Sequence, residues 1–157
     1  MQCTSQPQLS AKDVRQIMGM SGNHPLRCEK TVLESTDRGV ILEIRFEGGD
    51  SVARGHKMTK FIQNAIEEHR PAAIILNLLG IQAIFDTDVG GMVSAFRDRQ
   101  REINLPCIIA IRGVAARSLA SLLTITKMME IFDIVIVDGM DEALKQARQA
   151  VSGDIGD

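Results

Sequence analysis

The sequence has no tryptophan, no tyrosine and only five phenylalanines among its 157 residues. Proteins that bind single-stranded nucleic acid stack the bases on such rings, so we expect no surface of that kind. An excess of one charge is also missing, because 18 Lys and Arg stand against 20 Asp and Glu, for a formal net charge of −2. The chain therefore lacks a basic field, and we expect no nucleic-acid partner.

Cysteines and long apolar runs are scarce as well. Cys3, Cys28 and Cys107 are scattered without a Cys-x-x-Cys or Cys/His spacing, which excludes a disulfide framework and a zinc site. We expect reduced thiols, no metal and no cofactor. No apolar run approaches the roughly 18 residues that a membrane span needs, and the N-terminus lacks the apolar core of a signal peptide. We therefore expect a cytoplasmic protein that does not contact a membrane.

What is present is an ordinary globular composition, with 45% hydrophobic and 24% charged residues, and the length favours one domain. Residues 1–25 look like an N-terminal extension: a polar start is followed by Ser10, a suitable N-cap for a short helix over 11–20. Residues 26–152 form the expected domain.

Hydrophobic periodicity predicts the elements of this domain. Apolar residues alternate over 40–46, which indicates a strand with one buried face, and residues 26–36 pair with it in an antiparallel hairpin. Nearly continuous apolar stretches are typical of central strands covered on both faces, and apolar residues three and four apart indicate helices. The stretches are 72–81, 105–113 and 131–138; the helices are 52–69, 87–101, 116–129 with a possible break near Thr124–Thr126, and 140–151 with Asp138 as its cap.

The order strand, strand, helix and then alternating strands and helices predicts the fold class. Such alternation with short links implies right-handed crossovers and parallel strands, and the opening hairpin makes the sheet mixed. We expect a single α/β domain with a mostly parallel sheet of about five strands and helices packed against it.

Known catalytic patterns are not found. The sequence has no Gly-x-Ser-x-Gly elbow and no Gly-x-x-x-x-Gly-Lys-Ser/Thr phosphate-binding loop, and residues 47–55 lack the glycine spacing of a dinucleotide-binding loop. His24, His56 and His69 lie too far apart to form a base with an orienting partner, so we interpret them as surface residues. Since no residues fill the nucleophile, base and oxyanion roles together, we predict that the protein is not an enzyme and has no catalytic residues.

One stretch, "IFDTDVGGMV" (84–93), lies between an apolar strand and a helix. An aspartate or threonine at a helix start satisfies free backbone N–H groups, which stabilises a helix by about 1 kcal/mol, and acidic residues there meet the positive end of the helix dipole. The same geometry suits a phosphoryl group. Gly90 and Gly91 reduce side-chain bulk, which favours close packing or a docked partner. Capping and a regulatory docking site both remain open on these residues.

The chain resembles the STAS domain (sulfate transporter and anti-sigma-factor antagonist) over roughly residues 30–150. The likeness rests on the hairpin "VILEIRFEG", the strand and loop "AIILNLLGIQAIFD", the helix start "DTDVGGMVSAF" and the C-terminal "SLLTITKMMEIFDIVIVDGMDEAL". The helix start resembles the family's Asp-Ser-Ser-Gly-x-Gly motif. The C-terminal piece resembles the family's helix, strand and Asp-x-x-x-Glu-Ala segment.

The resemblance implies bacterial signal transduction and transcription regulation by protein–protein interaction. In anti-sigma-factor antagonists the second serine of the motif is phosphorylated by the anti-sigma kinase, and phosphorylation breaks the complex with that kinase. By position, Asp86 matches the motif aspartate, Thr87 the first serine, Asp88 the phosphorylated serine and Gly91 the later glycine.

Three departures from the motif matter for regulation. Asp88 carries no hydroxyl and cannot accept a phosphate, Val89 replaces a glycine, and Asn77 stands where the family often has Asp. The permanent charge of Asp88 either mimics the phosphorylated state or marks a domain that has lost switching. Thr87 remains a candidate acceptor.

We therefore predict a non-catalytic regulatory module that binds an anti-sigma kinase or another signalling protein. The alternative is a STAS-type module for a nucleotide or another small ligand, with a pocket near residues 79–86 and 112–118 where Arg117 would hold an anion. A homodimer formed through the N-terminal extension is a further alternative. The predicted partner-binding residues are Asp86, Thr87, Asp88, Gly90, Gly91 and, most weakly, Ser94.

Overall fold

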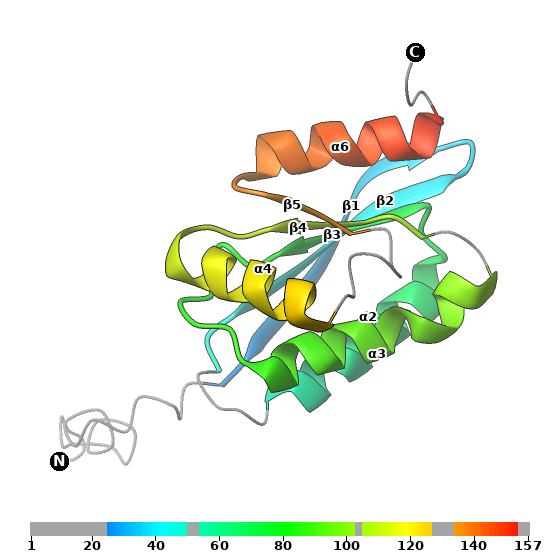
Figure 1. Cartoon of the computed structure of the whole chain (residues 1–157). Coiled ribbons are helices and arrows are strands. Elements are labelled where there is room, and N and C mark those ends of the chain that lie inside the picture. The colour runs from blue at the N-terminus through cyan, green and yellow to red at the C-terminus, as the bar shows by residue number, and fades with distance from the viewer. Residues whose placement is uncertain (1–24, 50–53, 103–104, 127–133, 154–157) are drawn as a thin grey trace, which may run out of the picture.

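The structure is a computed structural model that describes residues 25–49, 54–102, 105–126 and 134–153, without the side chains of 97–102 and 125–126. The short helix expected over 11–20, His24 and Cys3 lie outside the described residues. The described residues form one sheet with helices on both of its faces (Figure 1).

The sheet contains five strands, which lie side by side in the order β1-β2-β3-β4-β5. β1 is antiparallel to β2, and the remaining neighbours are parallel. The predicted mixed, mostly parallel α/β fold is thereby confirmed. The elements are β1 (Arg27–Thr36), β2 (Gly39–Glu47), α2 (Arg54–His69), β3 (Ala73–Asn77), α3 (Asp86–Glu102), β4 (Cys107–Ala110), α4 (Gly113–Thr126), β5 (Ile134–Val137) and α6 (Met140–Ser152).

The positions of the helices follow from the strand order. Every connection from β2 onward moves one strand further in the same direction. Because crossovers between parallel strands are almost always right-handed, α2, α3 and α4 have to share one face of the sheet, as Figure 1 shows. α6 follows the last strand and lies across the opposite face.

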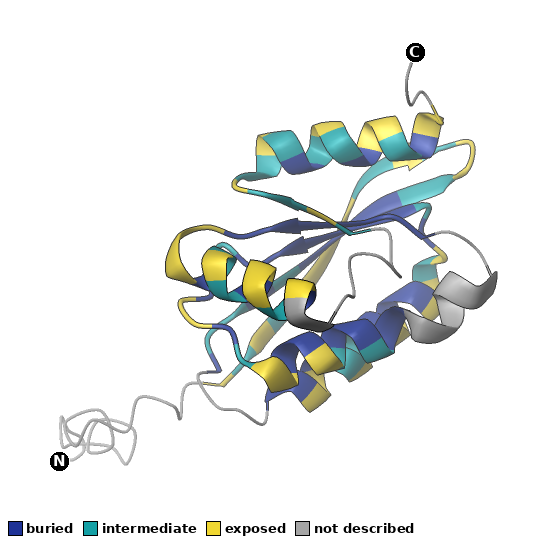
Figure 2. Ribbon diagram, viewed as in Figure 1, coloured by how far each residue is buried: buried dark blue, intermediate teal, exposed yellow. Residues whose placement is uncertain are grey.

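Two apolar clusters hold these layers together. The larger one packs β2, β3 and β4 against α2, α3 and α4, and the smaller one packs the other face of the sheet against α6. The middle of the sheet is therefore buried on both faces (Figure 2). This also corrects the expectation of one buried face for β2, since Ile41 is 0% and Glu43 is 6% exposed on the side that faces away from the larger cluster.

The apolar stretch 72–81 is a strand only as far as Asn77. Beyond it the chain turns, with the Ile81 N–H donating to the Leu78 carbonyl over 3.0 Å. Leu78, Ile81 and Ile84 are nevertheless buried and belong to the larger cluster. The strand prediction was too long because a buried loop is as apolar as a buried strand, and hydrophobicity alone does not separate them.

Two helix starts also differ from the prediction. α4 begins at Gly113 rather than at 116, so the strand expected over 105–113 is β4 and the start of a helix. Asp138 was expected to cap α6, and that prediction was wrong. Gly139, with φ −164° and ψ 165°, occupies the N-cap position, and no side chain caps the helix there.

Candidate functional site

The start of α3 lies at the edge of the sheet where the parallel strands end. β3 ends at Asn77, and a loop of eight residues leads to Asp86, the first residue of α3. α4 and α6 begin at the same edge, after β4 and β5. In open α/β sheets this edge is the usual place for binding, because loops and helix N-termini converge on it.

The six predicted site residues differ in exposure: three are exposed, two are half-buried and one is buried. The exposed residues lie on the outer side of the first turn of α3, and two others are half-buried further along the helix. Asp88 is 0% exposed. The exposed residues are Asp86, Thr87 and Gly90, and the half-buried ones are Gly91 and Ser94.

Asp88 caps the helix from its third position. The Asp88 carboxylate accepts the Phe85 backbone N–H over 2.8 Å, and the Phe85 carbonyl accepts the N–H of Val89 over 3.2 Å. Phe85 therefore stands at the N-cap position, and a side chain three residues later reaches back to it, as the acidic residue of a capping box does. The capping interpretation holds for Asp88, although an aspartate or threonine does not occupy the N-cap itself.

Arg54, at the start of α2, was missed by the sequence reasoning. Its side chain is 2% exposed and pairs with Asp88, with Nε to Oδ1 at 3.0 Å and Nη2 to Oδ2 at 2.7 Å. The same guanidinium donates to the carbonyls of Gly48 at 3.1 Å and Gly49 at 3.2 Å, and to the Ala83 carbonyl. Arg54 thus joins the end of β2, the loop before α3 and α3 itself.

The Phe85 ring adds an apolar wall to this cluster, because Arg54 Cζ lies 5.2 Å from the ring centroid. A guanidinium supplies five N–H donors in a planar fork, which suits a bidentate carboxylate and several carbonyls at once. A sequence signal existed: α2 has no acidic residue in its first turn but begins with an arginine, at the end of the helix dipole that disfavours positive charge. The ion pair with Asp88 explains why an arginine stands at this position.

This pairing changes the electrostatics expected of the site. Asp88 was expected to place a permanent charge where a docking protein would meet it. In the structure that carboxylate is enclosed and balanced by the Arg54 guanidinium. Asp86 is the aspartate of the motif that faces solvent, at the positive end of the helix dipole.

Gly91 permits a close crossing of α2 and α3. A Cβ at position 91 would lie 2.4 Å from the Gly55 carbonyl oxygen and 2.7 Å from Thr59 Oγ1, and a Cβ at Gly55 would lie 2.3 Å from the Thr87 carbonyl oxygen. The Thr59 hydroxyl donates to the Gly91 carbonyl over 2.8 Å. Gly90 differs, because a Cβ there would meet nothing within 4 Å. Gly91 therefore serves packing, and Gly90 leaves the outer surface bare.

Asn77 connects the sheet to the loop before α3. Its amide donates to the Glu43 carboxylate over 2.8 Å, and its side-chain oxygen accepts the Leu79 N–H over 3.1 Å. Asn77 and Glu43 are 8% and 6% exposed. A neutral amide satisfies the buried carboxylate here, whereas an aspartate would place two like charges together. The neighbouring Glu43 thus explains one departure from the STAS motif in physical terms.

The pocket expected between 79–86 and 112–118 stays a prediction. An open groove does include Arg112, Gly113 and Ala116, but its other wall is β5 and α6 rather than 79–86. Arg117 is exposed on α4 and does not line this groove. Within the described ranges, no three His, Cys, Asp or Glu side chains lie close enough to hold a metal ion.

The comparisons with known proteins bear on the fold. No protein-family model matches the chain, and no curated protein matches it. A solved structure is similar, that of an anti-sigma factor antagonist from Mycobacterium paratuberculosis, with a TM-score of 0.57 and 14% identity over 79% of this chain and 95% of that one. The fold is STAS-like. The likeness suggested by the sequence motifs is confirmed at the level of the STAS-like fold. That fold here has five strands, with β1 antiparallel to β2.

In the part of this STAS-like chain that the structure describes, no helix is both long and apolar enough to cross a membrane. His56 is exposed and His69 is half-buried, at opposite ends of α2, with His69 Nε2 3.5 Å from a Glu68 carboxylate oxygen. The two histidines therefore lie far from each other along the helix.

Proposed function

We propose that the protein is a regulatory module that binds a partner protein through the start of α3. The observation that carries the proposal is a small exposed surface formed by Asp86, Thr87 and Gly90. The buried Arg54–Asp88 pair beneath it holds the start of α3 in place. A rigid base lowers the entropy lost on binding, and a glycine lets a partner approach the backbone closely. The STAS-like fold of a known anti-sigma factor antagonist supports the same kind of role.

In this proposal the partner is an anti-sigma kinase or another signalling protein, and the module works in the cytoplasm without catalysis of its own. Asp88 acts from inside, by fixing the helix start, rather than as a contact residue. Because Arg54 neutralises it, Asp88 does not imitate an exposed phosphoserine. Thr87 is exposed one position earlier and is the proposed acceptor if the surface is switched by phosphorylation.

The test is an affinity capture from a lysate of the source organism, with four baits compared: wild type, Gly90→Arg, Thr87→Glu and Lys60→Glu. Gly90→Arg adds bulk where nothing obstructs it, and Lys60 is exposed on α2 as a matched control. We expect a partner that wild type and Lys60→Glu recover and that the other two baits lose. Recovery of the same proteins by all four baits would rule out this surface.

Phosphorylation of Thr87 has its own readout. The intact mass of the chain isolated from its source is compared with that of a Thr87→Val variant expressed in the same cells. We expect a fraction of the wild type, and none of the variant, to carry one phosphate. An equal phosphorylated fraction in both chains, or none in wild type, would remove Thr87 as the acceptor while leaving the docking surface intact.

The small-ligand alternative has a weaker basis in the structure. The groove beside α4 is open and mixes Arg112 with Asp138 and Glu142, so it does not present the uniformly basic lining that an anion such as a nucleotide favours. A thermal-shift panel of nucleotides decides the matter, since a ligand at a hundred times its Kd would stabilise the fold by about 2.7 kcal/mol. We expect no shift.

A further inference from the structure

A second surface also lies near the carboxyl ends of the parallel strands, but away from the start of α3. It is the groove between α4 and α6, with the end of β5 as its floor. β5 is the last strand of the sheet, so this groove runs along an edge to which no further described strand is added. The groove is lined by Ile111, Arg112, Gly113, Ala116, Val135, Ile136, Val137, Asp138, Glu142 and Gln146.

Two exposed valines belong to this region, one in the groove and one next to the groove residue Gly113 in the chain. Val135 in its floor is 36% exposed, and Val114 on the first turn of α4 is 64% exposed. Among the described residues the exposed large apolar side chains are these two and Val32, which lies on β1 at the opposite edge of the sheet. A partner that covers these two valines removes their apolar surface from water, which favours binding.

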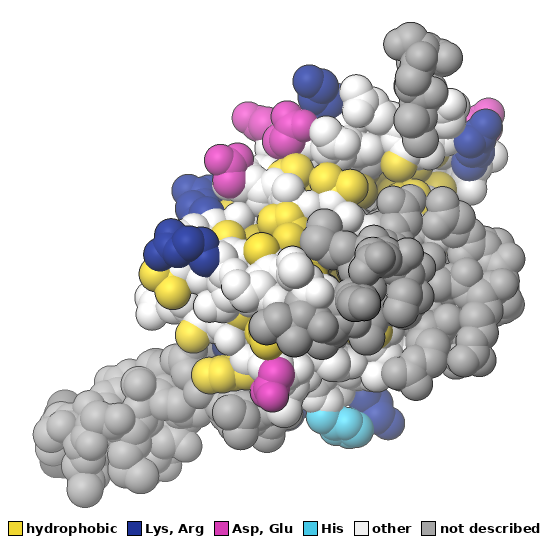
Figure 3. Space-filling model, in the orientation of Figure 1, with side chains coloured by type: hydrophobic (Ala, Val, Ile, Leu, Met, Phe, Trp, Pro, Cys, Tyr) yellow, Lys and Arg dark blue, Asp and Glu magenta, His cyan; other side chains and the backbone are white. Residues whose placement is uncertain are grey.

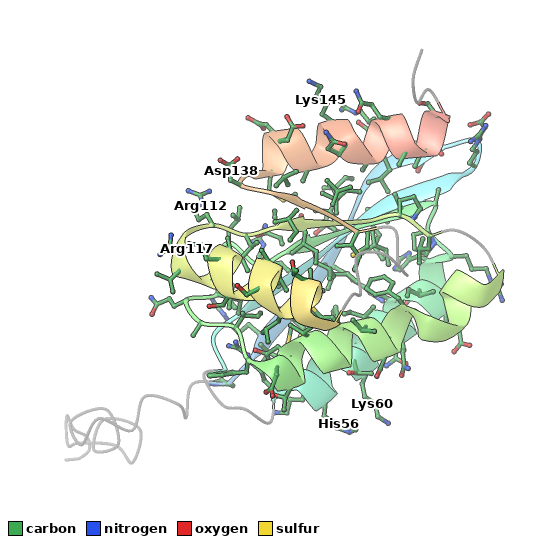
Figure 4. All side chains as sticks on the ribbon, in the orientation of Figure 1. His56, Lys60, Arg112, Arg117, Asp138 and Lys145 are labelled. Carbon is green, nitrogen blue, oxygen red and sulfur yellow. The ribbon has the colours of Figure 1, made fainter. Side chains whose placement is uncertain are left out.

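The two sides of the groove carry opposite charges. On the α4 side Arg112 lines the groove, and the exposed Arg117, which does not line it, follows one helical turn after Gly113 (Figure 4). On the α6 side Asp138 and Glu142 line the groove, and the first turn of α6 also carries Asp141. Figure 3 shows the acidic side chains directly above the basic ones at this end of the molecule. Within the described part of the chain, neither arginine forms a salt bridge, and neither does Asp138.

We propose that this edge binds a second copy of the chain in a twofold dimer, with α4 of each copy against α6 of the other. The twofold axis runs parallel to β5, just outside the edge of the sheet that β5 forms. Rotation by 180° about it leaves the strand direction of the second copy unchanged and turns its sheet over, so that the α6 face of one copy continues the α4 face of the other. It therefore places the start of α4 beside the start of α6 of the other copy, and the reverse contact follows from symmetry. Basic meets acidic twice, and Val114 and Val135 become buried between the copies.

The charge pattern favours this occupant over an acidic or a basic partner. A partner of one sign would meet attraction on one side of the groove and repulsion on the other. A second copy in this arrangement satisfies both sides at once, because each copy carries both signs at the same level along β5. Complementary charges of this kind select the partner and its orientation. The start of α3 follows β3, two strands in from this edge, so partner binding there does not depend on the dimer.

The test is sedimentation velocity of the full chain under reducing conditions over a range of concentrations. One variant reverses the basic side, Arg112→Glu with Arg117→Glu, and another reverses the acidic side, Asp138→Lys with Glu142→Lys. Lys57→Glu with Lys60→Glu on the outer side of α2 is the control. Circular dichroism of each variant verifies that the domain is folded.

We expect a dimer for wild type and for the control. Each reversed variant should dissociate, with a Kd raised about a hundredfold or more, because like charges then face each other across the interface. An equimolar mixture of the two reversed variants should form a heterodimer, since both contacts regain opposite signs. A monomeric wild type would overturn the proposal. So would a dimer that both reversals leave unchanged, or folded reversed variants that fail to associate when mixed.

Discussion

At the residue scale, the Arg54–Asp88 pair explains why an aspartate stands in the third position of α3. The sequence showed Asp88 as a residue for capping or docking, and the capping part is confirmed by its bond to the Phe85 N–H. The ion pair could not be predicted, because Arg54 lies 34 residues earlier in the chain. Periodicity identifies which positions are inside, but it does not identify which buried polar side chains meet.

Breaking this pair from one side should cost more than removing both members. Asp88→Ala leaves the Arg54 guanidinium buried without its counter-ion, and we expect a loss of about 3–5 kcal/mol in the free energy of unfolding. Arg54→Met should have a similar effect. The double variant Arg54→Met, Asp88→Leu should lose less than the sum of the two, because no uncompensated charge remains. Urea denaturation measures all four chains, and losses that simply add would show that the pair is not coupled.

At the element scale, the kinds of elements and their order were predictable, whereas their ends were not. The 3.6-residue period predicted the buried side of α3, and Val89, Met92, Val93 and Phe96 are indeed buried. The end of β3, the start of α4 and the cap of α6 depend on turns and backbone conformation, which hydrophobicity does not encode. Whether a glycine in α3 is needed for packing likewise depends on the neighbouring helix α2, and the local sequence does not reveal that contact.

Gly90 and Gly91 should respond in opposite directions to the same substitution. Gly91→Ala places a Cβ 2.4 Å from the Gly55 carbonyl oxygen, so α2 and α3 must separate, and we expect a loss of about 1–3 kcal/mol. Gly90→Ala meets nothing within 4 Å and should gain up to about 1 kcal/mol from helix propensity. Chemical denaturation compares the two variants. Equal effects would contradict the assignment of Gly91 to packing and Gly90 to the free surface.

At the scale of the whole molecule, α6 is attached to the hairpin at the far end of the sheet. Arg38 Nη1 donates to the Val151 carbonyl over 2.9 Å, and Arg148 forms an ion pair with Glu34 on β1, with Nε to Oε2 at 2.6 Å. These contacts join residues more than 110 positions apart. The sequence predicted that a final helix exists, but the long-range partners that hold it across the sheet were beyond its reach.

The Glu34–Arg148 pair should make stability depend on pH. The hydrogen bond from Arg148 lowers the pKa of Glu34 below its ordinary value of 4.5. A carboxyl whose pKa is lower in the folded state stabilises the fold above the unfolded pKa and loses that effect as the pH falls through the folded one. Glu34→Gln should therefore lower the free energy of unfolding at pH 7 but not at pH 2. Denaturation at both values measures this, and an equal difference at both would exclude the ion pair as the cause.

The central claim is that the start of α3 is a protein-docking surface, and site-specific photo-crosslinking tests it most directly. A photoreactive residue is placed at position 90, which has open space around it, or at Gln149 on the outer side of α6 as a control, and cells of the source organism are irradiated. The account predicts a discrete adduct with one protein at position 90 and none at 149. Absence of an adduct at 90, or the same adducts at both positions, would contradict it.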